Sequence, residues 1–202
     1  MNKNFERELP EGYKQVKHIN AKDIKLGLIL NGICLLVLAA VMVVAWLPLL
    51  SCDDSCIFAI DDPLATLIAL VVFILAMVAY IVLHELVHGI AYKSLTGEKL
   101  TFGLSWSCAF CGVPKVYTYR KTALIALVSP LIVFSVVLIA LTVALYFVSP
   151  IYYLMSAFLF GLHLGGCCGD IYVTLLFLFK FKDKRTLMRD TGPEQFFYVI
   201  EE

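Results

Sequence analysis

Long apolar runs separated by short polar segments dominate the pattern of this chain. Each run exceeds the roughly 20 residues that a helix needs to cross the hydrocarbon core of a bilayer. The four runs cover residues 26–50, 64–92, 122–148 and 151–179. The pattern therefore predicts an all-α membrane protein, in which a four-span membrane domain (26–180) lies between a cytosolic N-terminal segment (1–25) and a cytosolic tail (181–202).

The composition agrees with a membrane protein. Of the 202 residues, 61% are hydrophobic, and the mean hydropathy is +0.88. Roughly half of the residues of a soluble domain are apolar, so these values argue against an ordinary soluble protein.

The distribution of Lys and Arg residues predicts the orientation. The N-terminal segment, the loop 93–121 and the tail are basic, whereas the loop 51–63 has no Lys or Arg and carries four Asp residues. Because basic loops remain in the cytosol, we expect a multi-pass protein of the cell membrane with both termini cytosolic. This explains the basic tail, so no nucleic-acid partner is expected. Cys52 and Cys56 would form a disulfide only if their loop faces an oxidising compartment.

Residues 100–120 follow a different pattern, in which apolar and polar side chains alternate. The alternation runs over 100–107, and a second apolar stretch at 116–119 follows a turn candidate at 111–112. A period of two is typical of a strand with one apolar face. We therefore expect a small β-hairpin on the cytosolic side of the membrane.

The second apolar run ends in the residues that carry the chemistry, His84-Glu85-Leu86-Val87-His88. On a helix His84 and His88 share one face, so two imidazoles can bind one zinc ion there. Glu85 is then placed to act as a general base. Ionisable groups within a membrane span are costly and indicate function by default. The motif predicts hydrolysis of peptide bonds with zinc as the cofactor, although other divalent ions suit the same ligands.

A catalytic zinc site needs a third protein ligand. No Asp or Glu occurs between Glu98 and Asp170, and Asp170 lies inside the fourth apolar run. His84 precedes Lys93 by nine residues and Asp170 precedes Lys180 by ten, so both groups lie roughly 14 Å inside the cytosolic boundary. Asp170 is therefore the favoured third ligand. Glycines at 165, 166 and 169 would let the fourth helix approach the second closely.

Other candidates for the metal site fit less well. His163 shares a helix face with Asp170 but lies about 10 Å deeper, so we expect it to line the cavity or contact substrate unless the helix is broken. Glu98 is an alternative third ligand in a charged turn. Cys108 and Cys111 form a single C-x-x-C pair, which is weak support for a second metal site.

The chain resembles a bacterial membrane family described as putative zincin peptidases over most of its length after about residue 60. The resemblance rests on His84-Glu85-x-x-His88-Gly89, a loop with Trp, Cys and Pro, the Ser129-Pro130 pair and the late Gly169-Asp170 pair. That family is similar in plan to the site-2 proteases, in which an aspartate from a later helix joins the H-E-x-x-H helix. The resemblance implies His84, His88 and Asp170 as zinc ligands and Glu85 as the catalytic base. The chain departs from site-2 proteases in its Gly-Asp order and its few spans.

The function expected from these features is zinc-dependent intramembrane proteolysis. The expected partners are the lipid bilayer and a membrane-anchored protein or peptide substrate, which reaches a deep site most easily from within the membrane. Two other functions remain open: a divalent-metal transporter and a non-catalytic metal-binding scaffold. The first and third runs are almost free of ionisable residues, which disfavours a complete ion path. The sequence does not exclude a scaffold.

Overall fold

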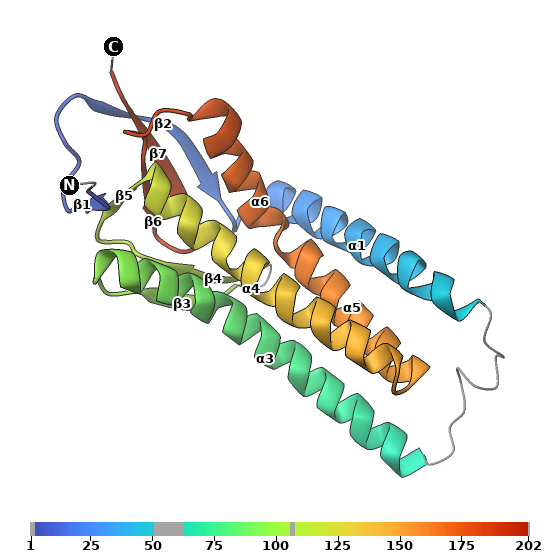
Figure 1. Cartoon of the computed structure of the whole chain (residues 1–202). Coiled ribbons are helices and arrows are strands. Elements are labelled where there is room, and N and C mark those ends of the chain that lie inside the picture. Colours follow the sequence, from blue (N-terminus) through green and yellow to red (C-terminus); the bar gives the residue numbers. More distant parts are fainter. Residues whose placement is uncertain (1–2, 51–62, 106–107, 202) are drawn as a thin grey trace. The chain divides into compact units, whose positions relative to one another are not determined.

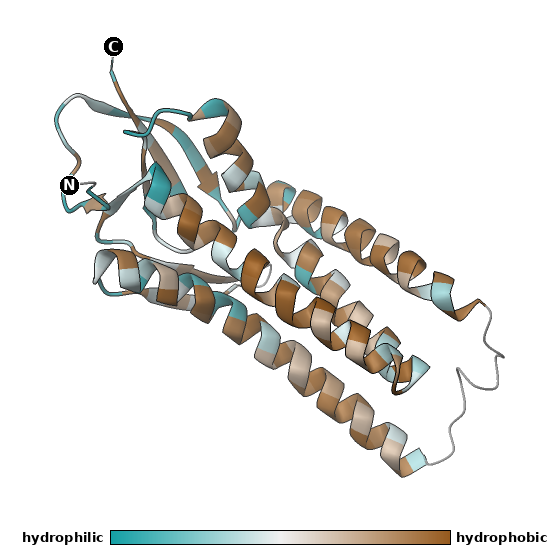
Figure 2. Ribbon diagram, in the orientation of Figure 1, coloured by the Kyte–Doolittle hydropathy of each residue, from teal (hydrophilic) through white to brown (hydrophobic). Residues whose placement is uncertain are grey.

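The structure, a computed structural model, describes residues 3–50, 63–105 and 108–201. Four of its helical segments are long and apolar enough to cross a membrane (Figures 1 and 2). They cover Ile24–Leu49, Pro63–Thr96, Arg120–Tyr146 and Pro150–Lys180. Their boundaries lie within a few residues of the four predicted runs. The predicted pairing of Cys52 with Cys56 lies outside the described residues.

The individual helices show where these segments are interrupted. They are α1 (Ile24–Trp46) with the 3₁₀ segment η1 (Leu47–Leu49), α3 (Pro63–Thr96), α4 (Arg120–Tyr146), α5 (Pro150–Gly166), α6 (Cys168–Leu175) and the π-helical segment η2 (Leu176–Lys180). The last predicted span is therefore divided, since α5 ends at Gly166 and α6 begins at Cys168. Glycine is a poor helix former, and this stretch is rich in it. The division places Asp170 in the first turn of α6.

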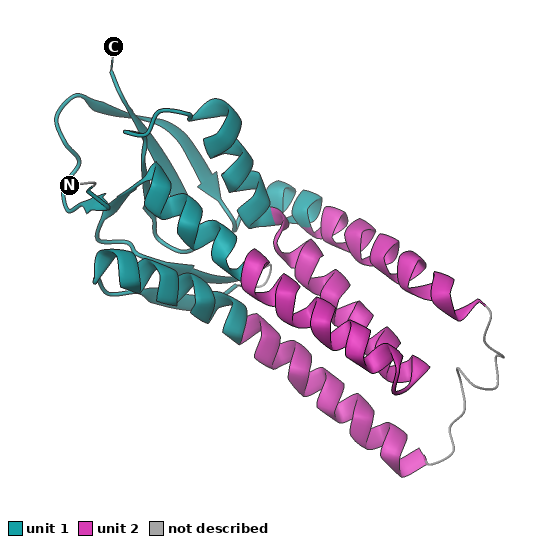
Figure 3. Cartoon of the chain, in the orientation of Figure 1, with its two compact units in different colours: residues 1–30, 83–130, 169–202 teal, residues 31–82, 131–168 magenta. Residues whose placement is uncertain are grey.

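The chain forms two compact units, coloured in Figure 3. Unit 1 comprises Met1–Leu30, Leu83–Pro130 and Gly169–Glu202, and unit 2 comprises Asn31–Val82 and Leu131–Cys168. The residues of the predicted metal site all belong to unit 1. The predicted boundaries at residues 25 and 180 stay a prediction.

Unit 1 contains more strand than the sequence predicted. Its antiparallel sheet has the order β1-β5-β6-β7-β2. The strands are β1 (Phe5–Glu6), β2 (Tyr13–Asn20), β5 (Tyr117–Tyr119), β6 (Leu187–Asp190) and β7 (Glu194–Ile200). The prediction of an all-α protein with one hairpin was therefore too narrow: the chain is mostly helical but carries this sheet as well. Its strands come largely from the two polar ends of the chain.

The predicted hairpin is present with a different second strand. β3 (Thr101–Leu104) pairs with β4 (Ala109–Gly112), in the register Phe102 to Cys111. Residues 116–119, expected to complete this hairpin, instead supply β5, which pairs with β1 and β6. Alternation identified β3 and β5 but missed β4, which contains the residues 111–112 that were expected to form the turn.

Apolar side chains from helices and sheet form the core of unit 1. Phe197 and Met188 of the sheet are fully buried and pack in one cluster with Ala123 of α4 and Phe177 of η2. A second cluster joins Tyr92 of α3 to Ala126 of α4 and to the segment that follows β4. These clusters hold the ends of α3 and α4 together, and both helices carry residues of the site.

Within the residues that the structure describes, unit 2 is built from helices alone. Tyr80, Leu138 and Leu159 form one of its buried clusters. A Cβ atom added to Gly165 would lie 2.8 Å from the carbonyl oxygen of Cys34, so this glycine lets α5 approach α1. The sequence analysis expected the glycines to bring the fourth helix against the second. At Gly165 the close neighbour is instead the first helix, whereas at Gly166 the nearest atom to an added Cβ is the Tyr80 hydroxyl of α3, at 3.9 Å.

Candidate functional site

The two histidines of the motif lie on one face of α3 within unit 1. His84 and His88 are each 7% exposed. Their ring centroids are 5.0 Å apart and the ring planes meet at 75°. Helical spacing of four residues produces this arrangement without any tertiary contact. Two buried imidazoles therefore face the same point beside the helix.

Asp170 reaches this point from α6. Its Oδ2 atom lies 3.4 Å from Nε2 of His84 and 3.2 Å from Nε2 of His88. The three ligand atoms all lie within 4.8 Å of one another, as required to hold a single metal ion. The structure thus brings together the three side chains that the sequence analysis singled out as ligands.

These distances suit a tetrahedral zinc ion. Zinc bonds to nitrogen and oxygen of about 2.0–2.1 Å imply roughly 3.3 Å between neighbouring ligand atoms of a tetrahedron. The two nitrogen–oxygen distances at Asp170 are close to this value. Two imidazoles and one carboxylate also leave the fourth position open, as in catalytic rather than structural zinc sites. The Asp170 side chain keeps 21% of its surface exposed, so the centre is not sealed on that side.

The hydrogen bond at Nδ1 of His88 indicates what the second ring nitrogen, Nε2, can bind. Nδ1 of His88 lies 2.8 Å from the carbonyl oxygen of Ala126 in α4. A carbonyl only accepts, so Nδ1 carries the proton and a neutral ring presents a lone pair at Nε2. That lone pair faces the Asp170 carboxylate. Two acceptors at this distance repel unless a proton or a cation lies between them, so the contact itself fits a metal site.

Glu85 lies beside this centre and is half-buried. Its carboxylate accepts a backbone hydrogen bond from Cys111, so β4 runs next to it. Close packing at Gly89 supports this arrangement, because a Cβ atom there would lie 2.7 Å from the ring of Phe102 on β3. The glycine after the motif lets the hairpin lie against α3. The candidate base is thus positioned by both the helix and the hairpin.

The same face of α3 continues to a residue pair that the sequence analysis missed. Tyr92, one turn after His88, is buried and donates a 2.8 Å hydrogen bond to Oδ2 of Asp190. The backbone N–H of Gly192 donates to the other carboxylate oxygen at 2.9 Å. Burial raises the pKa of Asp190 to about 6, although these hydrogen bonds favour its charged form. Only the repeat of four from His84 through His88 to Tyr92 signalled this site; Asp190 is remote in sequence.

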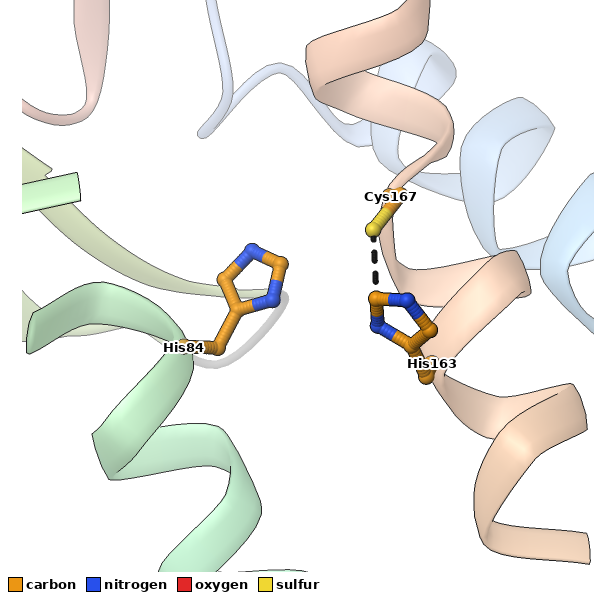
Figure 4. Close-up of side chains that lie close together, drawn as sticks. All are labelled: His84, His163 and Cys167. Carbon is orange, nitrogen blue, oxygen red and sulfur yellow. Dashed lines mark hydrogen bonds between the residues drawn. The ribbon is translucent and has the colours of Figure 1, made fainter. Parts of the chain in front are cut away.

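His163 lies in unit 2 and is fully buried. Its Nδ1 atom lies 2.9 Å from the Tyr80 hydroxyl and 3.7 Å from Sγ of Cys167, and its Nε2 lies 3.1 Å from the Ser135 hydroxyl. Figure 4 shows the contact with Cys167 as a dashed line. Both ring nitrogens therefore have partners within the helices of unit 2. A role in the cavity or in substrate contact stays a prediction.

Glu98 and the two cysteines of the C-x-x-C pair do not join the candidate centre. Glu98 forms an ion pair with Arg7, at 3.0 Å, rather than approaching the histidines. Burial raises the pKa of the Cys111 thiol to about 12. Among the described residues, Cys108 and Cys111 are absent from both groups whose ligand atoms converge closely enough for a metal ion.

Comparison with protein families identifies the chain's relatives. The model of the family described as "Putative zincin peptidase" matches residues 75–185, more than half of the chain. The chain belongs to this family. The matched range includes His84, Glu85, His88 and Asp170. Comparisons with curated proteins and with solved structures found no significant match. Family membership indicates a zinc metallopeptidase.

Proposed function

We propose that this protein is a zinc-dependent intramembrane metallopeptidase that cleaves membrane-associated proteins or peptides. The observation that carries the proposal is the approach of Asp170 Oδ2 to within 3.4 Å of both Nε2 atoms of the motif. His84, His88 and Asp170 would hold the ion, and Glu85 would act beside it. In plan this arrangement is similar to that of the site-2 proteases.

The chemistry divides between the ion and the protein. When bound, zinc would supply Lewis-acid chemistry that polarises a carbonyl group and activates water near neutral pH. Glu85 takes the proton from the attacking water and delivers it to the leaving amine. The backbone hydrogen bond from Cys111 holds the Glu85 carboxylate in place. The two histidines and Asp170 would hold the ion, and the Asp170 carboxylate would offset one of its positive charges.

The proposed location is the cell membrane, with both termini in the cytosol. Many large apolar side chains of α1, α3 and α4 are exposed, and the long helices in Figure 2 are predominantly hydrophobic. Exposed apolar surface on this scale is stable against lipid rather than water. Labelling of single cysteines with a membrane-impermeant maleimide tests the orientation. We expect labelling from outside at the loop 51–63 alone, and labelling of either terminus from outside would contradict it.

The hairpin offers a way to align substrate. β4 belongs to a two-stranded sheet, so one edge of the strand has no partner within that sheet, and Cys111 of this strand hydrogen-bonds to Glu85. An extended peptide that adds to this edge by main-chain hydrogen bonds would pass directly beside the base. Such binding selects unfolded or extended segments, which fits cleavage of substrates that have lost helical structure near the membrane surface.

The deciding experiment separates metal binding from catalysis. Glu85→Gln removes the base and leaves the three ligands intact, so the purified variant should keep its zinc and lose peptide cleavage. The assay substrate is a quenched fluorescent peptide that one apolar helix anchors in proteoliposomes. Glu98→Gln is the matched control and should retain both zinc and cleavage. If Glu85→Gln cleaves as the unmodified protein does, the peptidase proposal is wrong and a metal-binding scaffold is favoured. Zinc uptake into the same sealed vesicles would favour transport.

A further inference from the structure

Pro130 interrupts the hydrogen bonding of α4 at one specific carbonyl group. In an α-helix the carbonyl of residue i accepts from the N–H of residue i+4. Proline has no N–H, so Pro130 cannot bond to Ala126. Pro130 lies inside α4 and is fully buried, and water is therefore a poor substitute at this turn. The carbonyl of Ala126 lacks its regular helical donor.

The donor that takes this place is the His88 ring. Nδ1 of His88 lies 2.8 Å from the Ala126 oxygen, and Nε2 of the same ring lies 3.2 Å from Asp170. The preceding turn of α4 is also modified, because the hydroxyl of Ser129 donates to the carbonyl of Ile125. The Ser129-Pro130 pair therefore changes the hydrogen bonding of two successive carbonyls, one of which faces the metal site.

We propose that Pro130 is a positioning residue for the metal centre. By removing the N–H that Ala126 would otherwise accept, it reserves this carbonyl for Nδ1 of His88. The proton is thereby kept on Nδ1 and the lone pair on Nε2, directed at the ion. This inference rests on the proposed function, because a lone pair on Nε2 of His88 matters only if that nitrogen binds zinc. It predicts that zinc affinity depends on the absence of a backbone N–H at residue 130, although α4 supplies no side-chain ligand.

The first test restores the missing donor. Pro130→Ala gives residue 130 an N–H that competes for the Ala126 carbonyl. The zinc dissociation constant should therefore rise at least about tenfold, as it does when other groups that orient metal-bound histidines are lost. Competition with a chelator measures this constant. Pro150→Ala is the control: Pro150 begins α5, where an N–H has no helical partner. An unchanged dissociation constant in Pro130→Ala would overturn the inference, since the carbonyl would then serve both donors.

A second variant separates the missing N–H from the proline ring. Lactic acid incorporated at position 130 forms an ester, which has neither an N–H nor a ring. Zinc affinity should return to within about twofold of the unmodified protein. An ester variant that binds as weakly as Pro130→Ala would also overturn the inference, because packing of the ring would then be responsible.

The tautomer can be observed without metal. The signals of His88 can be assigned by their loss in His88→Gln. In chelator-treated protein labelled with ¹⁵N-histidine, these signals should show a proton on Nδ1. Pro130→Ala should shift the population towards a proton on Nε2. If the unmodified protein binds no zinc but Pro130→Ala still shifts the proton towards Nε2, the proposed function fails and the role of Pro130 in selecting the tautomer stands. If zinc binds and the tautomer is the same in both proteins, the positioning role fails alone.

Discussion

The hydroxyl of Tyr92 donates a hydrogen bond to the carboxylate of Asp190, although 98 positions separate the two residues in the chain. Tyr92 extends the face of α3 that carries both motif histidines, and Asp190 ends β6. The contact therefore ties the helix of the candidate metal site to the sheet of unit 1. Because Asp190 is only 2% exposed, its ionisation should be visible in the stability of the fold.

We predict that this carboxylate makes stability depend on pH between about 4 and 6. Burial raises the pKa of Asp190 to about 6, from an ordinary 3.8. The folded state therefore holds the proton more tightly than the unfolded chain, so the contribution to stability is fully present below pH 4 and is lost as pH rises through 6. The difference in pKa corresponds to a loss on the order of 3 kcal/mol.

Asp190→Asn should remove this segment of the pH profile. The amide keeps one of the two acceptor oxygens that Tyr92 and Gly192 use, and it does not ionise. Unfolding free energies of chelator-treated protein in detergent, measured from pH 4 to 7, test the prediction. Asp183→Asn is the control, because its exposed carboxylate has a pKa lowered by hydrogen bonds from Arg185. Parallel profiles for Asp190→Asn and the unmodified protein would refute the assignment.

Asp170→Asn should weaken zinc binding at least tenfold. The substitution keeps the shape of the side chain but removes the negative charge that approaches both imidazoles, and zinc binds a carboxylate more strongly than an amide. Metal content per chain after gel filtration measures the effect. Asp23→Asn is a fair comparison, because Asp23 caps α1 through its Oδ1 atom and Asn caps equally well. Full occupancy in Asp170→Asn would exclude this residue as a ligand.

Cys111 should be slow to react with maleimide at pH 8, and Cys108 should react first. Cys111 is 7% exposed, and burial raises the pKa of its thiol to about 12. Only the thiolate is nucleophilic, so very little of Cys111 is reactive at that pH. Cys108 is only partly buried. Mass spectrometry of the modified protein over time distinguishes the two sites, and equal rates would show that the Cys111 thiol is not buried.

Gly112→Ala should destabilise the protein by about 1–3 kcal/mol. A Cβ atom at this position would lie 2.2 Å from the backbone nitrogen of Gly192, and backbone cannot rotate away. The turn after β6 would be displaced, together with the strand that supports Glu85. Gly32→Ala is the matched control, because a Cβ atom there meets nothing within 4 Å and alanine favours the helix. Chemical denaturation should show a lower free energy of unfolding for Gly112→Ala and an unchanged or higher one for Gly32→Ala.

Local pattern was enough to predict the helical part of the fold. Apolar runs of sufficient length predicted the four long helices, and alternation predicted a hairpin near residues 100–120. The sheet of unit 1 was not predicted, since β2 pairs with β7, as in Tyr13 with Ile200. Neither strand buries a regular apolar face, and a pairing across almost the whole chain has no local signal.

The sequence alone predicted that two histidines share one face of a helix and that Asp170 is their candidate third partner. A spacing of four places two imidazoles together on any helix, and the scarcity of carboxylates after Glu98 left Asp170 as the favoured ligand. Tertiary structure decided what surrounds them: the Ala126 carbonyl on His88, the Cys111 backbone on Glu85 and the Asp190 carboxylate on Tyr92. Helical periodicity is a property of neighbouring residues, whereas hydrogen bonds between distant segments exist only after those segments pack.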